Sequence, residues 1–139
     1  MKPYPLHMEP KYKLQEVLHS QFSRIVACRA FGDVLEGDLG GYIEREENLS
    51  HDGNCWVYDE AWVTGAARVV HDAQVRDIAR VFGNAIIYGH AKILQESTVS
   101  GNARVSGYAR IFGQVHLRGS VHVHGGMEGG FVSNGAAII

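Results

Sequence analysis

Aliphatic side chains recur at every sixth residue through the middle of the chain. The series runs without exception through Val57, Val63, Val69, Val75, Val81, Ile87, Ile93, Val99, Val105, Ile111, Leu117 and Val123. Two residues before each of these stands a mostly small side chain, in order Cys55, Ala61, Ala67, Ala73, Ala79, Ala85, Ala91, Ser97, Ala103, Ala109, Val115 and Val121. Residues two apart on an extended segment point to the same side, so both series face inward and the residues between them face outward. Each hexad is therefore predicted to contain a short strand.

Glycine marks the end of most of these hexads. Two positions after the aliphatic residue stand Gly65, Gly83, Gly89, Gly101, Gly107, Gly113, Gly119 and Gly125. Glycine accepts the left-handed backbone angles that a tight bend needs. Three bends turn the chain through a full circle, so one coil takes 18 residues and rises by about 4.8 Å, the spacing between strands. The pattern predicts an all-β fold, a parallel β-helix of about four regular coils.

The remaining segments divide the chain without adding a second structural domain. An open β-helix end exposes unpaired backbone groups and core, so a differently built terminal unit is expected there. Ile43 and Leu49 are six residues apart and, by counting, fall in the register of the small residues. An N-terminal cap is predicted at 1–41, with strands near 11–14 and 23–31 and a helical turn near 15–19 between them. The β-helix spans 42–125, with an imperfect first turn at 42–53 and regular hexads at 54–125. The tail at 126–139 is predicted to pack on the last coil or on a neighbour.

The runs at 81–85 and 99–107 resemble the hexapeptide-repeat superfamily of left-handed parallel β-helices. Segments 31–34, 37–43, 47–50 and 54–59 narrow the resemblance to small bacterial and prophage-encoded repeat proteins labelled as transferases or polymer-forming proteins. The resemblance implies a left-handed β-helix with a β-rich cap, and a homotrimer.

Composition and charge limit the partners and the cellular location that can be expected. The formal net charge is −2, and the outward arginines are spread over all three faces, which excludes a surface for duplex nucleic acid. No stretch is apolar over the roughly 18 residues of a membrane helix, and the first residues lack the apolar core of a signal peptide, so a cytoplasmic location and no membrane contact are expected. Cys28 and Cys55 make no disulfide framework and are expected to be reduced.

Large apolar side chains also occupy outward positions on every face. They are Trp56, Trp62, Phe82, Ile86, Leu94 and Phe112. Exposed apolar patches of this kind usually mark association, so a homo-oligomer, with a trimer favoured, is predicted through these residues. The alternative is that the N-terminal segment folds back and covers several of them.

One corner of the predicted coil carries the candidate chemistry. Asp72, His90 and Tyr108 are eighteen apart and therefore stack, and His71 adjoins Asp72. In an enzyme, His90 would act as a general base, with Asp72 orienting it, Tyr108 as a hydrogen-bond partner, and His71 as an alternative base. The alternative is a polar ladder on an exposed corner.

Two further groups of residues suggest ligands. Arg68 and Arg104 with Tyr88 would suit a phosphorylated small molecule held between subunits, against an alternative of interface salt bridges. The acidic corner offers oxygen ligands for calcium, although like charges on a solvated edge explain it as well; it comprises Asp59, Glu60, Asp77 and Glu96.

Histidines near the end of the coil do not form a metal site in one chain. Zinc needs three or four converging ligands. His116 and His122 project from different faces, and His122 and His124 flank the inward Val123. No metal and no cofactor are therefore predicted, while a site shared across a trimer, as in the hexapeptide carbonic anhydrases, stays an alternative.

Function is predicted from this outer surface. The favoured hypothesis is a non-enzymatic binding or assembly protein, prophage-encoded in line with the resemblance, that acts on a host protein or a small ligand through its faces and subunit interfaces. The alternatives are a hexapeptide-type acyltransferase with an intersubunit histidine site and a metal-dependent carbonic-anhydrase-like protein. The lack of any loop interrupting 54–125 argues against an enzyme.

Overall fold

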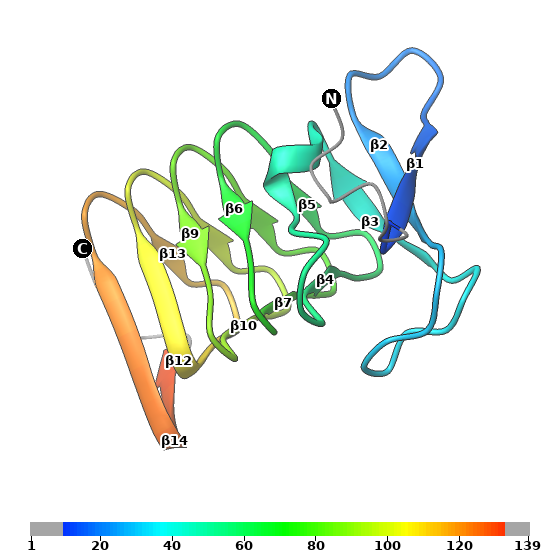
Figure 1. Ribbon diagram of the computed structural model, residues 1–139. Helices are drawn as coiled ribbons and strands as arrows, with labels where there is room; N and C mark the ends of the chain where they lie inside the picture. Colours follow the sequence, from blue (N-terminus) through cyan, green and yellow to red (C-terminus); the bar gives the residue numbers. More distant parts are fainter. Residues whose placement is uncertain (1–9, 133–139) are drawn as a thin grey trace.

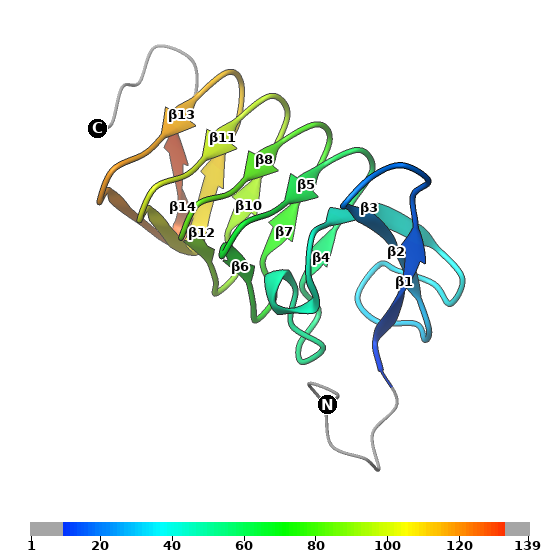
Figure 2. The same cartoon turned by 90° about the horizontal axis from the view of Figure 1, so that it is seen from above.

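The computed structural model describes residues 10–132, with the side chains of 128–132 excepted, and within them the chain winds into a stack of coils (Figures 1 and 2). Parallel strands in successive coils form three faces.

The first face holds β4 (Trp56–Val57), β7 (Gln74–Val75), β10 (Lys92–Ile93) and the end of β12 (Arg104–Ile111). The second holds β3 (Leu39–Ile43), β5 (Trp62–Val63), β8 (Arg80–Val81), β11 (Thr98–Val99) and β13 (His116–Leu117). The third holds β6 (Arg68–Val69), β9 (Ile86–Ile87), the start of β12 and the start of β14 (His122–Val132). The predicted all-β parallel β-helix is confirmed.

The inward series form the core as predicted. From Val57 to Leu117 every member of the aliphatic series has no exposed surface, and the small residues from Cys55 to Ala109 are equally buried. Coil-to-coil pairing follows the 18-residue step, for example Gln74 with Lys92 and Lys92 with Arg110. The core therefore follows directly from the hexad pattern.

One corner of the first three regular coils carries a residue other than glycine in the left-handed region. Asp59, Asp77 and Gln95 have φ of 56°, 62° and 60°. Each uses its side-chain oxygen to accept the backbone N–H directly above: Asp59 from Asp77 at 3.1 Å, Asp77 from Gln95 at 2.7 Å, and Gln95 from Gly113 at 2.8 Å. The carboxylates of this corner thus have a structural task, which accounts for them without calcium.

The N-terminal segment forms the expected β-rich cap. Strand β1 (Tyr12–Glu16) pairs antiparallel with β2 (Ser23–Ala27), and β2 pairs antiparallel with β3, which joins the second face. Figure 2 shows this hairpin continuing that face beyond the first coil. The helical turn expected at 15–19 is wrong: β1 continues to Glu16 and a turn at 18–19 follows, because pairing with β2 satisfies the backbone groups as far as Glu16.

The first turn of the coil is longer than a regular one. Ile43 pairs with Val63 and Leu49 bridges Val69, each over twenty residues instead of eighteen. Ile43 and Leu49 therefore lie under the aliphatic series and not under the small one. Two additional residues in 50–54, before β4, cause this shift, and the 3-10 turn η1 (Glu46–Asn48) precedes it.

The C-terminal strand carries a second irregularity. β14 pairs with β12 at the regular 18-residue step as far as the pair Gly107 and Gly125. The next pair is Ala109 with Gly130, so β14 has three more residues than β12 opposite Tyr108. Pairing resumes through Val132, beyond the 125 at which the hexads were predicted to end. The rest of the predicted tail, 133–139, lies outside the described residues.

Both cysteines are free, and Cys55 fills an inward small-residue position of the first coil. Within 10–132 the structure contains no helix long and apolar enough to cross a membrane.

Candidate functional site

The predicted corner column comes together. His90 Nδ1 lies 3.6 Å from Asp72 Oδ2, and the His90 and Tyr108 rings stack with centroids 4.6 Å apart and planes 7° apart. Asp72 also accepts the backbone N–H of Asn54 through its other carboxylate oxygen at 3.1 Å. The His90 side chain is 51% exposed, so its imidazole is accessible to a ligand.

This column forms one wall of a groove of about 560 Å³ on the first face. The floor is the neighbouring outward column, in which Gln74, Lys92 and Arg110 lie side by side on β7, β10 and β12. Met127, from the irregular part of β14, lines the groove as well. Wall and floor residues are two apart in the sequence, so each of three successive coils contributes one side chain to the wall and one to the floor.

The cap closes the other end of the groove. Asp33, in the loop between β2 and β3, accepts the Tyr58 hydroxyl at 2.7 Å and forms an ion pair with Arg76 at 2.9 Å. The guanidinium of Arg76 lies 3.7 Å above the Tyr58 ring. The hydrogen bond from Tyr58, followed by Arg76, lowers the pKa of Asp33, whereas burial and then the Asp33 carboxylate raise the pKa of Tyr58. Asp33 is thus held ionised and its charge is already balanced.

His71 does not join this groove. Its Nδ1 accepts the backbone N–H of Gly89 at 3.1 Å, and its ring meets the edge of Tyr88 at 6.1 Å between centroids. With φ of 59°, His71 takes the corner position that glycine occupies in the next two coils. Its contacts are those of a corner residue outside the groove that His90 lines.

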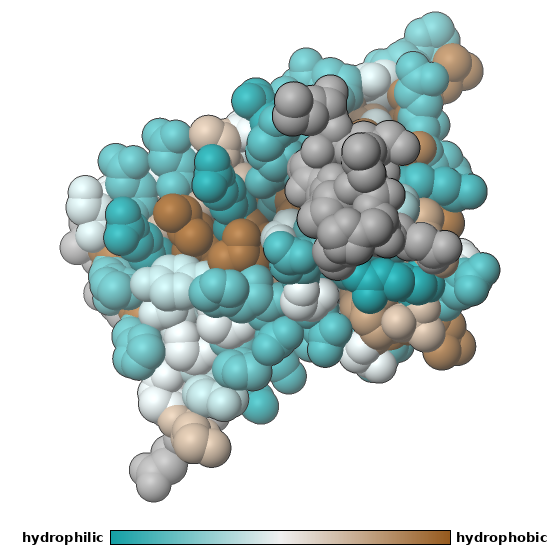
Figure 3. Space-filling model, viewed as in Figure 1, coloured by the Kyte–Doolittle hydropathy of each residue, from teal (hydrophilic) through white to brown (hydrophobic). Residues whose placement is uncertain are grey.

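The predicted phosphate ligands do not converge in one chain. Ile86 lies between Arg68 and Arg104 in the same column of the third face, which puts the arginines two coil rises apart, about 9.6 Å. Tyr88 contacts His122 instead, with its hydroxyl 3.3 Å from Nε2. Figure 3 shows this face with a small hydrophobic area among hydrophilic side chains.

The predicted interface residues differ in exposure. Trp56 is only 1% exposed because Phe31 and Tyr12 of the cap pack on it, with centroids 5.1 and 6.2 Å away. The cap, and not a partner chain, therefore covers Trp56. Phe22 and Arg80 partly cover Trp62. Phe82 is 41% exposed, and three others are half-buried: Ile86, Leu94 and Phe112.

A serine between two histidines was not predicted. Ser106 is buried, and its Oγ lies 2.9 Å from His124 Nδ1 and 3.4 Å from His122 Nε2. The 18-residue step from Ser106 to His124 is the signal that could have revealed the pair. Among the described residues no three His, Cys, Asp or Glu side chains are grouped closely enough to hold a metal ion.

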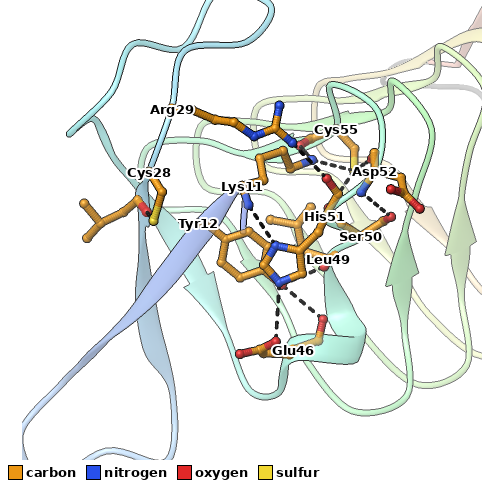
Figure 4. Close-up of polar contacts among 11 residues, drawn as sticks. Lys11, Tyr12, Cys28, Arg29, Glu46, Leu49, Ser50, His51, Asp52 and Cys55 are labelled. Atoms are coloured by element: carbon orange, nitrogen blue, oxygen red, sulfur yellow. Dashed lines mark hydrogen bonds and ion pairs between the residues drawn. The ribbon is translucent and has the colours of Figure 1, made fainter. Parts of the chain in front are cut away.

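The cap is joined to the first coil by buried polar contacts (Figure 4). Lys11 Nζ donates to the Cys55 carbonyl at 2.7 Å and contacts Cys55 Sγ at 3.3 Å, and burial lowers the lysine pKa. His51 Nδ1 accepts the Lys11 backbone N–H at 3.1 Å, and its ring stacks on Tyr12 at 4.1 Å. Burial lowers the pKa of His51 and raises that of the Cys55 thiol. An unreactive thiol fits a structural role for Cys55.

Stacked hexads with an inward small and aliphatic pair, closed by a β-rich cap, are the architecture of the hexapeptide-repeat β-helix superfamily. A similar sequence supports this. Over 37 residues the chain is 49% identical to the Escherichia coli (strain K12) protein named "Uncharacterized acetyltransferase YdcK". The match covers 27% of this chain and 11% of that relative. No protein-family model matches the chain.

Proposed function

We propose that this protein is a ligand-binding β-helix, without catalytic activity, that holds a small molecule in the groove of the first face. The observation that carries the proposal is the groove itself, because it combines a volume of about 560 Å³ with a small number of convergent polar side chains. Its residues come from four successive coils, the cap loop and β14, so the whole fold contributes to positioning them.

The proposed assembly is a homotrimer. Phe82 remains exposed and Leu94, Ile86 and Phe112 are half-buried, and side chains of this kind favour contact with another copy. The resemblance to prophage-encoded repeat proteins makes a host protein the second class of partner that fits the binding role.

Native mass spectrometry of protein purified from cells tests the proposal. We expect a trimer that carries a small molecule. Gln74→Trp fills the floor of the groove and should remove the bound molecule, whereas Asn102→Trp, on an exposed corner outside the groove, should retain it. A protein without any bound molecule, or one that Gln74→Trp leaves unchanged, would contradict ligand binding in this groove.

Acetyl transfer is the second candidate function. The 3.6 Å approach of His90 to Asp72 and the name of the E. coli relative favour it. His90 would accept the proton of an amine or hydroxyl acceptor while the acyl group passes to that acceptor from a thioester, releasing a free thiol. Incubation with acetyl-CoA and a panel of acceptors should then release thiol in the wild type and in His116→Ala, but not in His90→Ala. Absence of turnover with the wild type would reject this candidate.

A further inference from the structure

The two halves of the groove differ in the hydrogen-bonding groups they offer. The half towards β14 presents Lys92, Arg110, the Tyr108 hydroxyl and the His90 imidazole. Among the described residues Lys92 has no hydrogen bond or ion pair, so its ammonium charge is not balanced locally. Cationic donors that converge in a partly enclosed groove are suited to a carboxylate or a phosphate.

The half towards the cap presents acceptors. Asp72 faces the groove, and its nearest ionisable contact is the His90 imidazole, at a distance longer than a hydrogen bond. The other carboxylate, Asp33, is already neutralised by Arg76. Asp72 is therefore the acceptor whose charge is available to a ligand. It lies in the neighbouring column, one coil below Lys92 and two below Arg110, or about 5 and 10 Å along the coil axis.

The shape restricts the ligand further. From Asn54 to Tyr108 the wall spans three coil rises, about 14 Å. An extended molecule that lies along the coil axis can therefore contact side chains from several coils at once.

Resting on the ligand-binding function proposed above, we infer that the groove recognises a bipolar anion. Its carboxylate or phosphate binds Lys92 and Arg110, and its hydroxyl or ammonium donors, about 5 to 10 Å away along the coil axis, bind Asp72. The two ends of the ligand thus meet the two halves of the groove, and one-ended anions satisfy only one half.

Titration of the ¹⁵N-labelled full chain, followed by amide chemical shifts, tests this inference. The two-ended probes are 6-aminohexanoate and glucose 6-phosphate, and their one-ended controls are hexanoate and inorganic phosphate. We expect each two-ended probe to bind about two- to fivefold more tightly than its control, the effect of one partly exposed charged contact. A preference for 6-aminohexanoate alone identifies ammonium as the donor, and a preference for glucose 6-phosphate alone identifies hydroxyl.

Matched variants separate the two ends. Lys92→Gln should weaken all four probes by about fivefold. Asp72→Asn still accepts the Asn54 N–H but lacks the charge, so it should remove only the advantage of the two-ended probes. Lys13→Gln, on the exposed face of the cap, should change nothing.

The outcomes separate this inference from the proposed function. If the groove amides shift with the probes but Lys92→Gln and Asp72→Asn bind as the wild type does, the bipolar recognition is wrong. If none of the four probes shifts these amides, the inference is equally rejected. In both cases native mass spectrometry of Gln74→Trp still decides whether the groove binds a ligand at all.

Discussion

Substitutions at Asp77 test whether the acidic corner is a structural ladder. Asp77 contributes two separable features: a backbone φ of 62°, and a carboxylate oxygen 2.7 Å from the Gln95 backbone nitrogen. Alanine lacks both the tolerance for this φ and the acceptor, glycine lacks only the acceptor, and asparagine retains both. The three variants therefore isolate the two contributions at one position.

The expected losses follow from those features. Left-handed backbone costs alanine about 1–2 kcal/mol but is tolerated by glycine, aspartate and asparagine, and the hydrogen bond to the carboxylate contributes about 1–1.5 kcal/mol at this exposed site. Asp77→Ala should therefore lower the free energy of unfolding by about 2–3.5 kcal/mol, Asp77→Gly by about 1–1.5 kcal/mol, and Asp77→Asn by less than about 0.5 kcal/mol.

Equilibrium unfolding in urea measures these differences. Glu96→Ala is the control. Glu96 lies in the same acidic corner, but within the described part of the chain its carboxylate accepts a hydrogen bond from the side chain of Gln114 and from no backbone group, so the variant should stay within about 0.5 kcal/mol of the wild type. The reasoning is refuted if Asp77→Ala is no less stable than Asp77→Gly, or if Asp77→Asn destabilises as strongly as Asp77→Ala.

Three further predictions concern the cap and the corners. Trp56→Ala should cost about 3–5 kcal/mol in urea unfolding without changing the subunit count in native mass spectrometry, because the cap covers this ring; a changed subunit count would contradict that assignment. Burial lowers the pKa of His51 in the folded state, so the unfolded chain takes up its proton first as the pH falls below about 6.5. Stability present above that pH is then lost by up to about 1.4 kcal/mol per pH unit until the folded-state pKa is reached. His51→Gln should show a smaller fall in Tm between pH 7 and pH 5, and an equal fall would exclude His51 as the cause. Gly107→Ala should lower Tm more than Gly119→Ala, because both have φ near 70° but only at Gly107 would the new Cβ overlap the Gly125 carbonyl oxygen; equal losses would show that backbone strain alone decides.

The repeating part of the molecule was predictable because one rule acts at every hexad. Val75 and Ile93, its counterpart in the next coil, are buried for the same reason, namely alternation along an extended strand. The same 18-residue step predicts that Asp72 and His90 come together. It also places Lys92 beside Arg110, although nothing in the spacing singles out that column as the floor of a groove.

The contacts that the sequence did not reveal join the cap to the repeating coils, two kinds of segment that share no pattern. Lys11 reaches Cys55 across 44 residues, and Asp33 reaches Arg76 across 43. Neither pair is related by the repeat, so periodicity carries no information about it. The burial of Trp56 has the same origin, since its position in the hexad is outward and only the folded cap turns it into a core residue.

The groove lies where these two kinds of structure meet. Its wall and floor are columns of the repeat, and columns alone would form a continuous strip along the first face with no defined length. The Asp33 loop ends the strip at one side, and the three additional residues of β14, which bring Met127 to it, end it at the other. The irregular segments therefore set the size of the site, while the repeat sets the spacing of its charges at about 5 Å. A ligand selected by this groove must match both the size of the site and the spacing of its charges. The length of the ligand and the separation of its two polar ends are therefore the properties to vary first, before any single residue of the groove.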